Sequence, residues 1–196
     1  MRTLPHSSSS SPEPPRSAGY SEAFGLLHPK VQRWVWRQGW NELRDIQEQA
    51  VRPILERQHD VIIAAATASG KTEAAFLPIC SHILEQGLLD SVQVMEISPL
   101  KALINDQYRR LSGLCEALAI PVTRWHGDVS QGKKERLLRE PRGLLIITPE
   151  SLEALFVRRG PYMRRLFASL EYVVIDELHA FIGNERAFAP LVEDPY

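Results

Sequence analysis

Cysteine is scarce in this sequence, and long apolar runs are missing altogether. Only Cys80 and Cys115 occur among 196 residues, which excludes a disulfide-stapled scaffold, and their spacing matches no zinc motif. We expect both to be small apolar residues in a reducing compartment. No apolar run approaches the roughly 18 residues that a membrane span needs, and the N-terminal segment has no signal-peptide core. The sequence therefore predicts a cytoplasmic protein without a membrane partner.

Neither sign of charge is in excess over the whole chain. Lys and Arg number 23 and Asp and Glu 24, a formal net charge of −1, so total charge indicates no particular partner. Between Arg124 and Arg165, however, ten basic residues stand against five acidic ones, a local excess of +5. This run is equally consistent with a solvated helix face and with a sequence-blind contact to a nucleic-acid backbone, which salt weakens steeply.

The chain is expected to form one α/β domain after a tail. Residues 1–19 are rich in Ser and Pro and predict a disordered tail, and residues 20–196 predict a single domain. Five short β-branched runs predict strands covered on both faces, at 61–65, 92–97, 121–124, 144–147 and 172–175. Helical patterns occupy 45–57, 72–86, 101–117, 131–139 and 150–157. This alternation predicts an open, mostly parallel sheet with helices on both faces.

Polar clusters directly follow four of these five predicted strands. They lie at 66–72, 98–101, 148–150 and 176–179. Ligands of open α/β sheets bind at the carboxyl ends of the strands. The sequence therefore predicts that these clusters form one active face.

The first cluster has the pattern of a phosphate-binding loop. Ala-Ala-Thr-Ala-Ser-Gly-Lys-Thr, residues 65–72, follows a predicted strand and begins a helix, the context that a P-loop requires, although Ala65 replaces the usual first glycine. Backbone N–H groups would bind phosphate oxygens, Lys71 would reach the β- and γ-phosphates, and the Thr72 hydroxyl would bind Mg²⁺. The predicted nucleotide-binding residues of this loop are Thr67, Ala68, Ser69, Gly70, Lys71 and Thr72.

The last cluster supplies the complementary acidic groups. Asp176 follows a predicted strand directly, where a carboxylate is held rigidly enough to bind Mg²⁺. Glu177 is the adjacent candidate for the base that orients and activates water. An acidic pair capping a helix is the alternative, but the P-loop about 100 residues earlier favours a nucleotide site with Lys71, Asp176 and Glu177 as the catalytic residues.

Gly70-Lys71-Thr72 together with Asp176-Glu177-Leu178-His179 resembles motifs I and II of superfamily-two helicases of the DExH type. The resemblance implies a RecA-like P-loop NTPase domain that uses ATP and Mg²⁺. The run from Gly39 to Gln47 resembles a Q motif, which implies that Gln47 binds adenine, with Phe24 as a stacking residue. Leu43 and Arg44 depart from the Pro-Thr of DEAD-box proteins.

Two further runs resemble the nucleic-acid-binding motifs Ia and Ib. They are Ser-Pro-Leu-Lys-Ala-Leu at 98–103 and Thr-Pro-Glu-Ser-Leu at 148–152. Each places a hydroxyl and helix N-terminal amides at a strand end, which suits phosphate, although Ser, Thr and Pro are also common at ordinary helix starts. Gly127 would allow a phosphate to approach the backbone, whereas His126 is expected to be structural. The predicted contacts are Pro99, Leu100, Lys101, Gly127, Thr148, Pro149 and Glu150.

The detailed sequence of the motifs over residues 21–186 resembles the Lhr (large helicase-related) branch. Examples are Trp-His-Gly-Asp-Val at 125–129 and Ile-Asp-Glu-Leu-His-Ala-Phe-Ile-Gly at 175–183. That branch implies a DNA-dependent ATPase that moves 3′ to 5′ on single-stranded DNA and often serves DNA repair, with His179 coupling the nucleotide and strand sites. After Arg186 the resemblance ends.

The resemblance also implies parts that the sequence does not show. Motif III and a second RecA-like domain, which carries arginine fingers, are not recognisable, so we expect weak ATP–Mg²⁺ binding and slow hydrolysis by this chain alone. We interpret the chain as a domain that is cut off after motif II. A truncated product, a frameshifted product and a split protein are equally consistent with this interpretation. An RNA helicase domain and a non-catalytic nucleic-acid-binding remnant stay open as alternatives, and another P-loop class such as a kinase is disfavoured by the 148–150 and 176–179 clusters.

Overall fold

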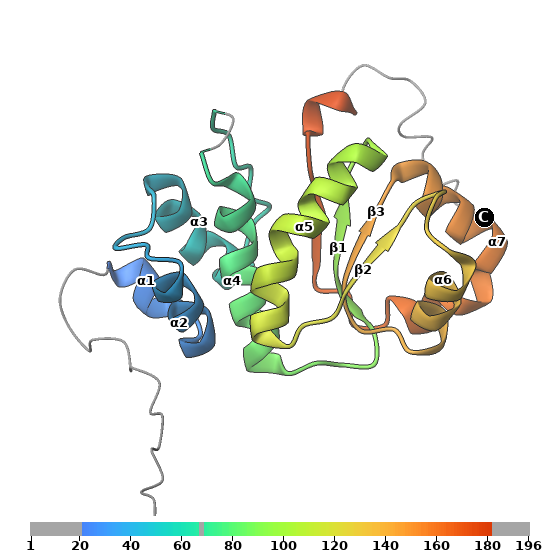
Figure 1. Ribbon diagram of the computed structural model, residues 1–196, viewed down its shortest axis with the longest axis horizontal. Coiled ribbons are helices and arrows are strands. Elements are labelled where there is room, and N and C mark those ends of the chain that lie inside the picture. The colour runs from blue at the N-terminus through green and yellow to red at the C-terminus, as the bar shows by residue number, and fades with distance from the viewer. Residues whose placement is uncertain (1–20, 67–68, 182–196) are drawn as a thin grey trace, which may run out of the picture.

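The computed structural model describes residues 21–66 and 69–181 and has an α/β architecture (Figure 1). Three helices precede the P-loop region, after which strands and helices alternate. In chain order the elements are α1 (Glu22–Leu26), α2 (Pro29–Arg37), α3 (Asp45–Glu56), α4 (Lys71–Gln86), β1 (Val92–Ile97), α5 (Lys101–Leu118), β2 (Val122–Trp125), α6 (Gln131–Arg139), β3 (Gly143–Ile147), α7 (Pro149–Leu166), β4 (Tyr172–Ile175) and a 3₁₀ turn at Leu178–Ala180.

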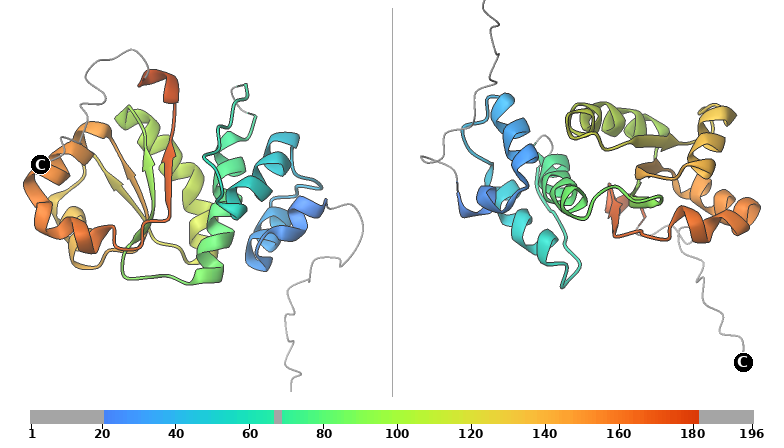
Figure 2. Two further views of the ribbon diagram at one scale, coloured as in Figure 1. Left: turned by 180° about the vertical axis from the view of Figure 1, so that it is seen from behind. Right: turned by 90° about the horizontal axis from the view of Figure 1, so that it is seen from below.

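The four strands form one parallel sheet in the order β2-β3-β1-β4. Helices α4 and α5, backed by α1 to α3, cover one face, and α6 and α7 cover the other (Figure 2). All five residues of the inner strand β3 are buried, because each of its faces meets one of two apolar clusters. The open parallel sheet with helices on both faces, predicted from the sequence, is confirmed.

Four of the five predicted strands form, with bounds within one residue of those predicted. The helix predicted at 150–157 continues to Leu166, with a kink at Arg159 (φ −132°, ψ 24°) two residues before Pro161. A proline inside a helix removes a hydrogen bond and clashes with the preceding turn, which explains the kink. The tail at 1–19, Thr67 and Ala68, and the region after Phe181 lie outside the described residues.

The strand predicted at 61–65 is wrong. Residues 61–66 have no strand assignment, and Ile62 is 81% exposed. The sheet of described strands ends at β4, which lies at its edge (Figure 2). An apolar run of this kind is buried only when neighbouring strands pair with it. No described strand pairs with residues 61–66, so most of their apolar side chains stay exposed. Only Ile63 packs partly against the core.

Both cysteines lie in the core, as predicted. Cys80 on α4 and Cys115 on α5 are each 1% exposed and unoxidised. The neighbouring Cys115 side chain, together with burial, raises the pKa of Cys80 well above its usual value. In the described ranges the structure has no helix long and apolar enough to cross a bilayer.

Candidate functional site

The carboxyl ends of the four strands lie level with one another. Ile97 of β1 pairs with Ile147 of β3 and with Ile175 of β4, and Trp125 of β2 also pairs with Ile147. The sequence thus places one polar residue after each strand at the same edge, namely Ser98, His126, Thr148 and Asp176. Three of the four predicted polar clusters therefore share one edge of the sheet.

No described strand leads into the P-loop; the described residues of the loop are positioned at the N-terminus of α4. Gly70 caps α4 with φ +91°, a left-handed conformation that glycine adopts readily. The Lys71 ammonium donates to the carbonyls of Ala65 and Ala66, at 2.8 and 3.3 Å, so the lysine lies inside its own loop. The Ser69 hydroxyl is buried and has no hydrogen-bond partner among the described residues. An anion bound in the loop would satisfy this hydroxyl.

Gln107 of α5 joins the two predicted halves of the nucleotide site. The Thr72 hydroxyl donates to Gln107 Oε1 at 3.2 Å, and Gln107 Nε2 donates to Asp176 Oδ2 at 3.1 Å. The side chains of Thr72 and Asp176 are therefore held one amide apart, although 104 positions separate them in the sequence. A hydroxyl beside a carboxylate is a donor set that suits Mg²⁺. Sequence reasoning missed Gln107, because no motif distinguishes it from other polar residues on a helix.

The acidic pair is fixed at the end of β4. Asp176 Oδ1 accepts a hydrogen bond from the Glu177 backbone N–H at 3.0 Å. Glu177 has φ +51°, a left-handed conformation that costs a non-glycine residue about 1–3 kcal/mol and is common at functional sites. Its Oε2 lies 3.2 Å from Nδ1 of His179, whose side chain is 80% exposed. The Glu177 carboxylate thus stands at the surface beside the fixed Asp176.

Gln47 lies against the P-loop, at a pocket of about 410 Å³. Its side chain is 2% exposed, and its Oε1 accepts from the Arg44 backbone N–H at 3.0 Å. A Cβ atom on Gly70 would meet Gln47 Nε2 at 2.6 Å, so glycine leaves the room that the amide occupies. The other lining residues are Trp40, Asn41, Glu42, Glu73 and Arg110. This pocket joins the run that resembles a Q motif to the P-loop.

Phe24 does not line that pocket. It is 6% exposed and belongs to the apolar core around α1 and α3, so the structure does not place it for stacking on a base. Trp40 is the aromatic residue of the pocket instead. It follows Gly39 in the same run, and its ring packs edge-on against Trp34, 5.6 Å between centroids.

A second pocket, of about 620 Å³, lies on the β2–β3 side of the edge. Of the seven residues predicted to contact nucleic acid, all but Pro149 line it. Thr148 also caps α7: its hydroxyl accepts from the Ser151 N–H at 3.3 Å and donates to the Ser151 hydroxyl at 2.9 Å. Thr148 therefore caps α7 and lines the pocket at the same time, so its role as a helix cap is compatible with the predicted contact to nucleic acid.

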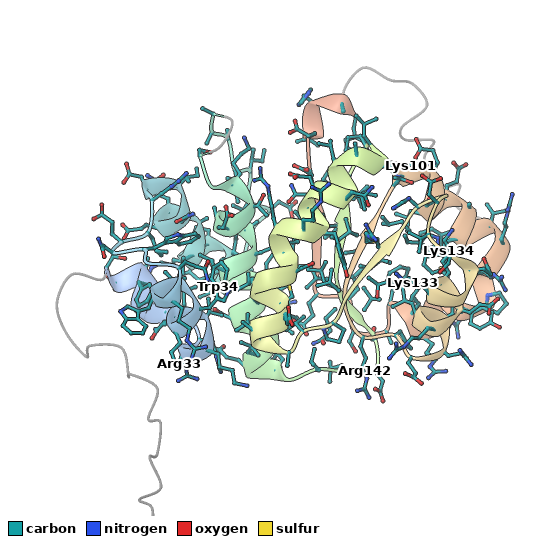
Figure 3. All side chains as sticks on the ribbon, viewed as in Figure 1. Arg33, Trp34, Lys101, Lys133, Lys134 and Arg142 are labelled. Carbon is teal, nitrogen blue, oxygen red and sulfur yellow. The ribbon has the colours of Figure 1, made fainter. Side chains whose placement is uncertain are left out.

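Lys101, the first residue of α5, lines this second pocket and is labelled in Figure 3. Its ammonium donates to Asp128 Oδ1 at 3.0 Å, and this hydrogen bond lowers the pKa of Asp128. A Cβ atom on Gly127 would lie 3.3 Å from Lys101 Nζ, so glycine at 127 gives the lysine its place. Asp128 therefore pairs with Lys101, the cation that the sequence predicted to contact nucleic acid.

Two buried titratable groups lie near the same edge. Burial, and then the negative charge of Asp176, raises the pKa of Glu96 on β1 from its usual 4.5 to about 8. Burial lowers the pKa of His126, which lies 3.9 Å from Asp128 and whose ring nitrogens form no hydrogen bond within the described ranges. The residues that the structure describes contain no cluster of three or more His, Cys, Asp or Glu suited to a metal ion.

Comparison with known proteins gives a consistent assignment. The model of the DEAD/DEAH box helicase family matches residues 44–194. The ATP-dependent helicase Lhr-Core of Methanothermobacter thermautotrophicus is 34% identical over 180 residues, which cover 84% of this chain and 20% of that protein. The chain therefore spans about a fifth of the length of this relative.

Solved structures agree on the fold. The helicase Lhr of Mycobacterium smegmatis, bound to ssDNA and AMP-PNP, has a TM-score of 0.70 at 26% identity, covering 82% of this chain and 21% of that one. Mss116p bound to ssRNA and AMP-PNP has a TM-score of 0.71 at 23% identity, over 81% of this chain and 33% of that one. The chain thus belongs to the DEAD/DEAH box helicase family, and its described residues form an N-terminal RecA-like domain similar to that of Lhr-type helicases.

Proposed function

We propose that this chain is the ATP-binding domain of an Lhr-like, ATP-dependent DNA helicase. Its substrates are ATP–Mg²⁺, at the P-loop and Asp176, and single-stranded DNA, at the 620 Å³ pocket. The main support for the proposed nucleotide site is the amide of Gln107, which links the Thr72 hydroxyl to the Asp176 carboxylate. A DNA-repair role and a cytoplasmic location are parts of the same proposal.

Each group of the nucleotide site has one task. Gln47 contacts the adenine edge, and the N–H groups of residues 67–72 bind phosphate oxygens. Lys71 leaves the carbonyls of Ala65 and Ala66 to reach the β- and γ-phosphates. Thr72 and Asp176 hold Mg²⁺, which when bound neutralises charge on the phosphate oxygens. Glu177 accepts the proton of the attacking water, because it stands exposed beside Asp176.

We expect hydrolysis by the isolated chain to be slow. An arginine finger raises the rate of phosphoryl transfer by roughly 10³ to 10⁵, and the family carries it on a second RecA-like domain. His179, 80% exposed on the 3₁₀ turn, is proposed to couple the nucleotide and strand sites through contacts with that domain.

Binding of a fluorescent ATP analogue with and without Mg²⁺ tests the nucleotide site. We expect Lys71→Ala to abolish binding and Asp176→Asn to remove its dependence on Mg²⁺. Lys30→Ala, a change at an exposed lysine of α2 away from the site, is the matched control. Binding that survives Lys71→Ala unchanged would contradict the proposal.

The choice of DNA over RNA rests on similarity to Lhr, whose structure with ssDNA is the nearer in sequence of the two compared structures. Backbone contacts discriminate poorly between the two, so RNA is the second candidate. Competition between DNA and RNA strands of one sequence decides between them. ATPase activity that single-stranded DNA stimulates and Lys71→Ala abolishes would exclude the non-catalytic alternative.

A further inference from the structure

The lining of the 620 Å³ pocket includes apolar side chains that phosphate binding does not require. We propose that it binds a nucleobase turned out of a single strand, while cationic side chains at its rim hold the neighbouring phosphates. This inference rests on the proposed binding of single-stranded nucleic acid and adds a base subsite to the backbone contacts predicted from the motifs.

Apolar side chains from three elements form part of the lining of the pocket. Trp125 at the end of β2, Leu138 of α6 and Leu155 of α7 are 8%, 6% and 2% exposed and line it, together with Ala154. Phosphate is bound by N–H, hydroxyl and cationic groups, which gain nothing from an apolar wall. A flat heteroaromatic base gains free energy from such walls by leaving water and by stacking on aromatic and aliphatic side chains.

The rim has the charge that a nucleotide needs. Lys101, Lys134, Arg158 and Arg159 line the pocket from α5, α6 and α7, against the single carboxylate of Glu150. Figure 3 shows Lys101 and Lys134 on the same half of the molecule, far from Arg33 and Trp34. In the structure as described, neither Lys134 nor the two arginines form an ion pair, so these three cations are available to phosphates.

Two local features connect the rim to the interior. The Lys134 ammonium lies over the Trp125 ring, 5.8 Å from its centroid, so one side chain of the rim contacts the aromatic wall. The kink of α7 falls at Arg159, and Arg158 and Arg159 line the pocket from this point of the helix. Cations around an apolar hollow match an anionic strand with flat apolar bases better than a neutral peptide or a bare phosphate.

The test compares two oligonucleotides of equal length and charge. One is a labelled single-stranded DNA hexamer, and the other is the same hexamer built from abasic tetrahydrofuran residues. Fluorescence anisotropy with the full chain should give at least about fivefold tighter binding to the base-containing strand. This comparison uses the unmodified protein and so does not depend on the folding of any variant.

Variants locate the effect. Ala154→Leu fills the pocket without changing charge and should reduce affinity for the base-containing hexamer to the abasic level. The control Ala117→Leu, at an exposed position of α5, should leave both affinities unchanged. Arg158→Ala should weaken both hexamers by a similar factor. Equal binding of the two hexamers by the unmodified chain overturns the base subsite alone, and a base preference that persists in Ala154→Leu overturns its location. Failure to bind either hexamer at low salt overturns the proposed function itself.

Discussion

The two sides of the carboxyl edge are built in different ways. On the side proposed to bind nucleic acid, β1, β2 and β3 end in register and the pocket lies at the end of a sheet whose strand β3 is fully buried. On the side proposed to bind the nucleotide, residues 61–66 pair with no described strand, and the Lys71 and Gln107 side chains hydrogen-bond to the neighbouring loop carbonyls, Thr72 and Asp176. Similar β-branched sequences thus give a buried strand in one place and an exposed segment in the other. Burial depends on neighbours as much as on local sequence.

A pair of matched substitutions measures this contrast most strongly. Ile146→Ala in β3 removes a side chain that is 0% exposed and should lower the free energy of unfolding by about 2–5 kcal/mol. Ile62→Ala, at 81% exposure, should change it by less than about 0.5 kcal/mol. Urea denaturation measures both. Similar losses for the two variants would show that residues 61–66 are buried in solution and would break the comparison.

The start of β3 offers a second test. Gly143 has φ +68°, and a Cβ atom there would lie 2.3 Å from the Pro121 carbonyl oxygen, so Gly143→Ala should cost roughly 2–3 kcal/mol. Gly113→Ala is the control, because that glycine lies within α5 with nothing within 4 Å, and alanine should stabilise the helix by about 0.5–1 kcal/mol. Thermal melts should therefore shift in opposite directions. Two shifts of the same sign would contradict this reading.

Glu96 lies between the two sides, on β1 and near Asp176. Its pKa is raised to about 8 in the folded chain, so its contribution to stability is fully present below about pH 4.5 and is lost as the pH rises towards 8. The free energy of unfolding should fall by up to about 1.4 kcal/mol per pH unit in this window. Glu96→Gln should remove that slope and be more stable than the parent at pH 8.

Denaturant titrations from pH 5 to 8 measure this slope. Glu153→Gln, at an exposed position of α7, should leave it unchanged. If the Glu96→Gln chain keeps the slope of the parent, another group is responsible, and the burial of Glu96 beside Asp176 does not control it.

The smallest expected effect concerns the ion pair between Asp128 and Lys101, which lines the 620 Å³ pocket. Asp128→Asn weakens the hold on Lys101 and removes a negative charge, so affinity for single-stranded DNA should rise about two- to threefold at low salt. The increase should disappear at high salt, because both side chains are exposed. Anisotropy titrations at two salt concentrations measure it. Unchanged or weaker binding at low salt would mean that Lys101 meets no phosphate.

Local signals predicted much of the fold. α6 and β4 have the predicted bounds, 131–139 and 172–175, because helical patterns and β-branched runs act over a few positions. The segment at 61–65 was predicted wrongly, since its pattern cannot report whether a neighbouring strand is present. The length of α7 was also predicted wrongly. The sequence pattern indicated a helix end at residue 157, whereas the helix bends at Arg159 and continues to Leu166.

The candidate site shows the same division. Motif resemblance named Thr72, Asp176 and Gln47, which the structure brings to one edge of the domain with Gln107 and Gly70 between them. Their roles stay predictions. Gln107 and the apolar interior of the larger pocket could not be found from sequence, because both depend on which faces of α5, α6 and α7 meet in space.

One continuous helix touches both sites. α5 begins at Lys101, which lines the larger pocket, and six residues later carries Gln107, whose amide contacts Thr72 and Asp176. Six residues of α-helix rise about 9 Å, and a helix moves as a rigid rod over that length. If a strand binds Lys101 as proposed, α5 connects that lysine directly to the Gln107 amide beside Thr72 and Asp176, so the two proposed sites share one helix within this domain.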